Sequence, residues 1–174
     1  ADGILLSEGS KLDWFNNNNI HTNTAHPISM HVTDAVNLSA GNQYSNNGKE
    51  FIQLTGDDLN VITKEITLKK LEESFLLSGT ITAGNKFCIT AGSHVYMDGN
   101  AKIIIEGAKG AGSFCALGTA ANPIFIQAIY NGTGLWKSIR FRSSDSNDNK
   151  IEYCTISGGG ANTGSSTEGM ITES

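Results

Sequence analysis

The sequence has little proline, little charge and no long apolar run. Only 2 of its 174 residues are proline, and charged residues make up 17% of the chain. No apolar stretch approaches the roughly 18 residues that a membrane-crossing helix needs, so we expect no membrane span. The chain begins at Ala1, with neither an initiator methionine nor the apolar segment of a signal peptide, and we therefore expect a processed or trimmed form.

Basic residues are outnumbered by acidic ones. Lys and Arg total 12 against 17 Asp and Glu, which gives a net charge of −5 at pH 7. Nucleic acids and anionic membranes bind basic surfaces, because a basic face releases counterions from the polyanion. The composition therefore argues against a nucleic-acid partner, although it leaves room for a local basic patch.

Cysteine is scarce, and its spacing does not fit a zinc site. Cys88, Cys115 and Cys154 lie far apart, each within a run of strand-forming residues, and the sequence has no CxxC pair or His/Cys cluster. We expect neither a metal nor a cofactor. Buried thiols are the favoured interpretation, because free cysteine is among the most buried residue types. One disulfide with one free thiol is the alternative.

What the sequence does contain is glycine and short alternating runs. Between residues 78 and 160, apolar, β-branched and aromatic residues alternate with polar ones, and each run ends in a turn of Gly, Asn, Asp or Ser. The expected strands are residues 79–82, 86–90, 94–97, 102–106, 113–117, 123–127, 138–141 and 150–156. Strands this short are not stable alone, so the sequence predicts an all-β protein of stacked repeats, each slightly longer than about 20 residues.

The chain divides into three parts. Residues 1–60 contain polar loops and two expected strands, near residues 28–32 and 51–54, and form either a small sandwich or a cap. Residues 61–160 carry the repeats. Within them, residues 61–75 fit either a helix or two strands around a charged turn, and we favour the strands because no helix stop signal follows. Residues 161–174 are a polar tail without a convincing cap, which predicts a truncated solenoid or an end covered by a partner.

Four segments resemble the repeats of one protein family. They are residues 75–95 (FLLSGTITAGNKFCITAGSHV), 116–126 (ALGTAANPIFI), 136–141 (WKSIRF) and 149–159 (NKIEYCTISGG). Together they resemble the coils of secreted, pectin-lyase-like β-helix proteins of Bacteroidetes, over about residues 61–160. The resemblance implies a right-handed parallel β-helix and an extracellular or cell-surface location, outer-membrane-associated and periplasmic sites included. It implies no single activity, because such folds serve as lyases, hydrolases, adhesins and surface proteins.

The candidate ligand-binding residues lie between positions 136 and 142. If Ile139 and Phe141 point inward, Arg140 and Arg142 share the outer face of one strand, close to Trp136. Guanidinium groups bind carboxylates in a bidentate way, and a neighbouring indole can stack on a sugar ring. The three residues Trp136, Arg140 and Arg142 therefore suit an acidic glycan.

A simpler interpretation is that Trp136 packs at a corner and the arginines form surface ion pairs. The acidic residues expected as their partners are Asp145, Asp148 and Glu152. Residues 145–149 also place oxygen atoms at alternate positions, as a calcium loop does, but Lys150 stands where the turn needs a glycine. An Asx-rich turn explains this segment without a metal.

The histidines and carboxylates suggest no further site. His21, His26 and His31 are spaced by five residues, which suits neither one face of a strand nor one face of a helix. With His94, they are expected on the surface or in loops. Carboxylates such as Glu106 lie on different strand edges and form no catalytic pair, so we assign no catalytic residue.

These observations favour a secreted or cell-surface β-helix module that is non-catalytic and either structural or glycan-binding. The alternative is a fragment of a β-helix polysaccharide lyase or glycoside hydrolase, with most catalytic residues beyond position 174. A third hypothesis is an assembly subunit that stacks end to end through open solenoid ends. If the chain is part of an enzyme, we expect a groove lined by charged or aromatic residues from consecutive repeats. If it is a scaffold or adhesin, we expect ladders of Asn, Thr and Ser.

Overall fold

In the computed structural model, the described residues are 1–7, 10, 12–56, 60–108, 111–131, 135–161 and 171–173. They form an almost entirely β structure, in which the paired strands all run parallel. A short 3-10 helix, η1 (Val32–Asn37), follows the third strand. Within this described part of the chain, no helix has the length and apolarity that crossing a membrane requires.

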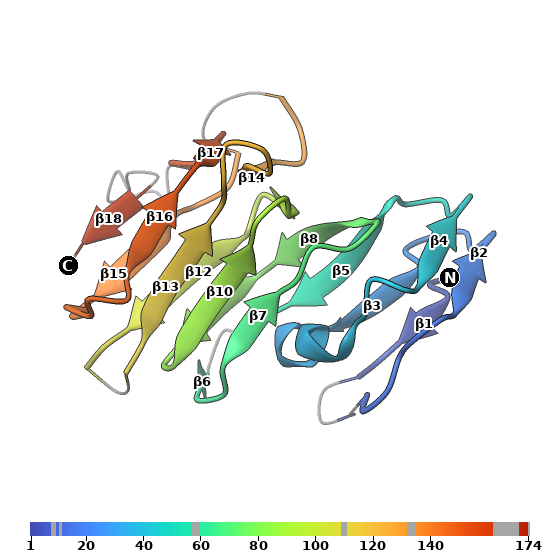
Figure 1. Cartoon of the computed structure of the whole chain (residues 1–174), viewed down its shortest axis with the longest axis horizontal. Helices are drawn as coiled ribbons and strands as arrows, with labels where there is room; N and C mark the ends of the chain where they lie inside the picture. The colour runs from blue at the N-terminus through green and yellow to red at the C-terminus, as the bar shows by residue number, and fades with distance from the viewer. Residues whose placement is uncertain are drawn as a thin grey trace.

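The strands form three larger sheets and one pair (Figure 1). The seven-stranded sheet contains β1 (Ile4–Leu5), β3 (Ile28–His31), β5 (Phe51–Thr55), β8 (Ser74–Ser78), β11 (His94–Met97), β14 (Ile124–Ala128) and β17 (Cys154–Ser157). The five-stranded sheet contains β18 (Ile171–Glu173), β15 (Ile139–Arg142), β12 (Lys102–Glu106), β9 (Thr80–Ala83) and β6 (Val61–Ile62). The four-stranded sheet contains β16 (Lys150–Glu152), β13 (Ser113–Leu117), β10 (Lys86–Thr90) and β7 (Ile66–Leu68). The pair consists of β2 (Asn19–His21) and β4 (Gln43–Ser45).

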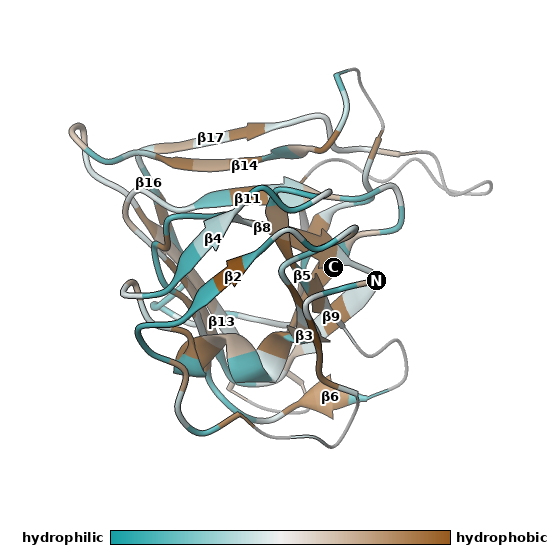
Figure 2. Ribbon diagram, turned by 90° about the vertical axis from the view of Figure 1, so that its right-hand side faces the viewer, coloured by the Kyte–Doolittle hydropathy of each residue, from teal (hydrophilic) through white to brown (hydrophobic). Residues whose placement is uncertain are grey.

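The chain visits the three larger sheets in a fixed rotation. From β6 onward, successive strands enter the five-stranded, the four-stranded and the seven-stranded sheet in turn, and the cycle then repeats. Viewed from the end, the sheets lie on different sides of a shared interior (Figure 2). The all-β, parallel prediction is therefore confirmed.

Inward-facing side chains line up from one repeat to the next. Phe87 on β10 is in register with Phe114 on β13, and their ring centroids lie 5.9 Å apart. Ile81, Ile103 and Ile139 occupy one row across β9, β12 and β15. All five side chains are completely buried. Successive residues of a strand point to opposite faces, so these rows explain the alternation in the sequence.

The strands expected between residues 79 and 156 are confirmed, with small shifts at their ends. The run at 150–156 is divided into β16 and β17 by Tyr153, whose φ of 48° turns the chain. Residues 61–75 form strands, as favoured, since β6 and β7 lie within them and β8 begins at Ser74. Later repeats are longer than expected, because Thr80 pairs with Lys102 but Ile103 pairs with Ile139.

The N-terminal region does not form a separate sandwich, because its strands β1, β3 and β5 belong to the seven-stranded sheet. Strand β5 pairs with β3 on one side and with β8 on the other, so no break in the sheet separates residues 1–60 from the repeats. The expected strands near 28–32 and 51–54 are confirmed as β3 and β5, but Val32 belongs to the unpredicted helix η1. A ring nitrogen of His31 accepts a hydrogen bond from the Thr33 N–H at 3.4 Å and caps this helix.

Asparagine ladders connect the first repeats. The side-chain oxygen of Asn42 accepts hydrogen bonds from the backbone and side-chain N–H groups of Asn18, both at 3.0 Å. Just beyond the other end of the paired strands β2 and β4, the side-chain oxygen of Asn47 accepts the corresponding bonds from Asn23, at 3.1 and 2.9 Å. Stacked asparagines satisfy the turn backbone without any ligand.

The C-terminal segment also contributes to a sheet. Strand β18 pairs with β15, so part of the segment expected to be a polar tail continues the five-stranded sheet. Residues 162–170 and 174 lie outside the described residues. Ile151 is in register with the buried Ala116, yet 39% of its surface is exposed, and Ile171 is 46% exposed. These residues mark an apolar edge at the end of the described repeats.

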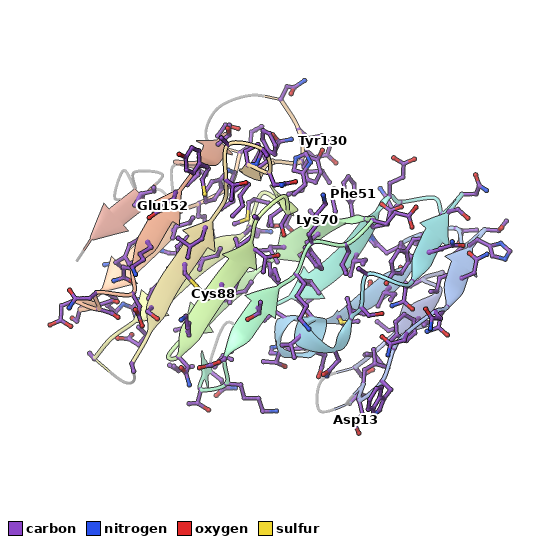
Figure 3. The ribbon with its side chains drawn as sticks, in the orientation of Figure 1. Asp13, Phe51, Lys70, Cys88, Tyr130 and Glu152 are labelled. Carbon is purple, nitrogen blue, oxygen red and sulfur yellow. A yellow bond between two sulfur atoms is a disulfide. The ribbon has the colours of Figure 1, made fainter. Side chains whose placement is uncertain are left out.

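A disulfide joins Cys88 and Cys115, which are in register on β10 and β13 (Figure 3). The less favoured alternative of the sequence analysis therefore holds for these two residues, and Cys154 is the free thiol. The thiol of Cys154 contacts the Ala116 carbonyl oxygen at 3.3 Å, and burial raises its pKa. Cys154 is partly buried and packs against the hydrophobic core.

Reducing the Cys88–Cys115 disulfide should lower the free energy of unfolding by about 3 kcal/mol, because the bond restricts the unfolded chain over a sequence separation of 27 residues. Urea unfolding with and without reductant measures the loss. The Cys154→Ala variant is the matched control and should show the same sensitivity to reductant as the wild type. Equal stability of the oxidised and reduced proteins would contradict this prediction.

Candidate functional site

Trp136 cannot act as the sugar-stacking residue expected from the sequence. Its side chain is completely buried, and its indole N–H donates a hydrogen bond to the Ser157 carbonyl oxygen at 2.8 Å. The indole therefore presents no face to a ligand. The alternative interpretation, in which Trp136 packs at a corner, describes its position.

Arg142 forms an ion pair with a buried carboxylate. Its Nη1 donates to Oε2 of Glu106 at 3.0 Å, and the two residues are in register on β15 and β12. Glu106 is only 2% exposed and also accepts a hydrogen bond from the Ala108 N–H at 3.2 Å. The partner is thus Glu106 and none of the three acidic residues expected. Arg140 is partly buried on the same outer face of β15 as Arg142, and it is in register with Ile104 on β12.

The segment 145–149 is a hydrogen-bonded turn. The Asn149 side chain donates to the carbonyl and hydroxyl oxygens of Ser144, at 3.2 and 3.0 Å, and accepts from the Phe114 N–H at 2.9 Å. Asp148 donates its backbone N–H to the Ser146 hydroxyl oxygen. These bonds fit the Asx-turn interpretation. Across the described residues, no group of three His, Cys, Asp or Glu side chains is arranged to hold a metal.

Three of the four histidines contact an oxygen atom of a neighbouring residue through a ring nitrogen. A ring nitrogen of His21 contacts the Thr22 hydroxyl, that of His31 contacts the Thr33 hydroxyl, and that of His26 contacts the Phe51 carbonyl oxygen. His94 differs, because it lies in the middle of the seven-stranded sheet among aromatic rings. It leads to a feature that the sequence analysis did not identify.

Four rings form a layer on the outer face of the seven-stranded sheet, which we call the aromatic layer: Phe51, His94, Tyr96 and Phe125. The centroid of Tyr96 lies 4.8 Å from that of Phe51 and 4.5 Å from that of His94. His94 is in turn 5.3 Å from Phe125. The layer crosses β5, β8, β11 and β14, since Phe51 reaches over β8 to meet Tyr96.

The sheet register explains how the aromatic layer assembles. Phe51 is in register with Ser74 on β8, and this small side chain leaves space for the Phe51 ring. Tyr96 is in register with Leu76, which is only 6% exposed although it faces outward. Leu76 and the four rings lie outside the main core cluster. Phe125 remains 36% exposed at one end of the layer.

Carboxylates border the aromatic layer on one side. Glu50 and Glu73 immediately precede Phe51 and Ser74, which are in register on neighbouring strands. Burial raises the pKa of Glu73, and the charges of Glu50 and Glu72 raise it further. Carboxylates at this border would repel a polyanion.

Outward alternation in the expected strands could have revealed His94, Tyr96 and Phe125 as surface aromatics. Nothing in the sequence shows that Phe51 meets them, because that contact depends on which strands are neighbours.

A scan against protein-family models, a search of curated proteins and a search of solved structures each found no match. No detected relative therefore assigns a function to this chain.

Replacing Arg142 by alanine should lower the free energy of unfolding by about 2 kcal/mol, because the buried Glu106 side chain would lose its ion-pair partner. Chemical denaturation measures the loss. The double variant Glu106→Gln/Arg142→Ala removes the stranded charge and should recover part of the stability. If the double variant were less stable than Arg142→Ala alone, the buried charge would not be the cause.

His94 should make the protein less stable in mild acid. Burial lowers the pKa of His94, a side-chain hydrogen bond with Gln127 opposes this by raising it, and within the described structure the buried Nε2 of His94 has no hydrogen-bond partner. The unfolded chain therefore binds a proton more readily than the folded one, and stability falls as the pH drops through the ordinary range of histidine.

The His94→Phe variant keeps an aromatic ring in the layer but cannot be protonated. Its free energy of unfolding should fall less than that of the wild type when the pH is lowered from about 7.5 to about 5.5. Urea unfolding at several pH values makes the comparison. Parallel pH profiles for the two proteins would show that His94 does not titrate differently on folding.

Proposed function

We propose that the chain is a right-handed parallel β-helix that acts as a non-catalytic, polysaccharide-binding module in an extracellular or cell-surface setting. This is the architecture and location implied by the resemblance to the pectin-lyase-like β-helix proteins of Bacteroidetes. The rotation of strands through three parallel sheets supports the solenoid. Right-handed winding follows from the strong preference of parallel strands for right-handed crossover connections.

The observation that carries the binding function is the aromatic layer. Aromatic faces and edges bury the apolar faces of sugar rings, and a row of them suits an extended polymer better than a single small molecule. Neighbouring strands lie about 4.8 Å apart, close to the length of one sugar residue in an extended chain. A polysaccharide running across the strands would therefore meet successive repeats with successive sugars.

Charge favours a neutral polymer over an acidic one. The chain carries a net charge of −5, and glutamates border the aromatic layer. Of the arginines expected to bind an acidic glycan, Arg142 is already paired with Glu106. A neutral glycan avoids the repulsion and needs only ring stacking and hydroxyl contacts.

The asparagine ladders support a scaffold role. In Asn18 with Asn42, and in Asn23 with Asn47, the side chains bond each other and the turn backbone. The disulfide between Cys88 and Cys115 supports an oxidising compartment such as the extracellular space, where such bonds persist.

A glycan array that contains neutral and acidic polysaccharides tests this function. We expect the intact protein to bind neutral polymers, and the Tyr96→Ala/Phe125→Ala variant to lose at least about tenfold in affinity, because two aromatic contacts are removed. Tyr130→Ala is the matched control, since this exposed tyrosine lies outside the aromatic layer. Binding that survives loss of both layer residues, or no binding by the intact protein, would refute the proposed surface.

A further inference from the structure

A cleft of about 370 Å³ lies away from the aromatic layer, beside an exposed tryptophan. We call it the Trp14 cleft. It is lined by three separate parts of the chain, residues 13–16, residues 37–40 and Lys69. In Figure 3, Asp13 lies at the opposite margin of the ribbon from Tyr130. The volume falls within the range of small-ligand pockets.

Trp14 is exposed because its neighbour anchors the segment. Phe15 is 8% exposed and forms a parallel bridge with Leu38, which is 1% exposed. Trp14 and Asn37 each stand one position before this bridge, and both line the cleft. Trp14 is 84% exposed, the largest exposure among the described large hydrophobic residues.

Hydrogen bonds hold the walls of the cleft in place. The Phe15 carbonyl oxygen accepts from the Ser39 hydroxyl at 3.2 Å and from the Asn42 side chain at 2.7 Å. Asn37 is the last residue of η1, and Lys69 donates to the Val36 carbonyl oxygen in the same helix at 2.8 Å. These bonds fix Phe15, Ser39 and Lys69, so this part of the lining is organised before a ligand arrives.

The lining suits a sugar better than it suits an apolar or a charged ligand. An exposed indole offers a flat apolar face, and two carboxamides, those of Asn16 and Asn37, can each donate to and accept from neighbouring hydroxyl groups. Asp13 and Lys69 contribute opposite charges, so the cleft has no strong preference for an anion or a cation.

We propose that the Trp14 cleft binds a neutral sugar ring, which stacks on Trp14 and forms hydrogen bonds to Asn16 and Asn37. The inference rests on the proposed polysaccharide-binding function and adds a second, separate contact point to it. Since the lining comes from segments around residues 14, 38 and 69, the site exists only when consecutive N-terminal repeats are stacked.

The two tryptophans make the test specific, because the chain has only Trp14 and the buried Trp136. Their indole N–H resonances in a ¹⁵N-labelled sample are assigned with the Trp14→Phe variant. Neutral linear hexasaccharides of glucose, mannose and galactose are then titrated, with a galacturonic acid hexasaccharide as the acidic comparison. We expect at least one neutral probe to shift the Trp14 resonance saturably, while the Trp136 resonance stays in place.

Variants sharpen this result. Trp14→Ala should abolish binding of the neutral probe, and Asn37→Ala should weaken it about fivefold, the loss expected for one hydrogen bond of average strength. Asn100→Ala changes an exposed turn asparagine elsewhere and should keep the wild-type affinity. An unmoved Trp14 resonance with every neutral probe, or a larger response to the acidic one, would overturn the inference.

The inference and the proposed aromatic surface can fail separately. If array binding depends on Tyr96 and Phe125 but the Trp14 resonance never moves, the aromatic layer stands and the cleft inference falls. If the Trp14 resonance moves while the Tyr96→Ala/Phe125→Ala variant keeps full array binding, the cleft inference stands and the aromatic layer loses its proposed role.

Discussion

Backbone hydrogen bonds between parallel strands hold each residue beside its counterpart in the next repeat, and the other interactions follow from this register. It aligns Phe87 with Phe114 inside the protein. On the outer faces, the same register brings Cys88 to Cys115 and Arg142 to Glu106. A shift of one residue would turn every inward side chain outward, so the apolar rows and the cross-strand bonds specify one another.

Local patterns predicted the strands well because their causes are local. A strand of alternating residues that ends in a polar turn can be recognised in the sequence without knowing which strands it pairs with. The runs from residue 79 onward accordingly coincide with observed strands. Joining the N-terminal region to the same sheet depends on pairings such as Met30 with Leu54, which lie far apart in sequence. The helix η1 buries Val32 and Ala35 against the rest of the protein, and no pattern in the local sequence predicted it.

The candidate residues show where face alternation stops being informative. Arg140 and Arg142 lie within β15, and alternation placed them on its outer face; Trp136 precedes the strand, where the rule has no force, and it is buried. The acidic partner of Arg142 comes from the previous repeat and not from the residues that follow it in sequence. Register, which a single sequence does not reveal, thus decided which charges meet.

The aromatic layer and the Trp14 cleft differ in one respect: the contribution to folding stability accounts for the first but not for the second. The rings of the layer contact one another, and Tyr96 lies in register with the nearly buried Leu76, so they stabilise the sheet even without a ligand. Trp14 covers little, because 84% of its surface faces water, and an exposed indole adds little to folding. A polymer that contacts both would gain affinity from two linked contacts, each of which could be weak. The stacked repeats would fix the separation of those contacts and so select for ligands long enough to span them.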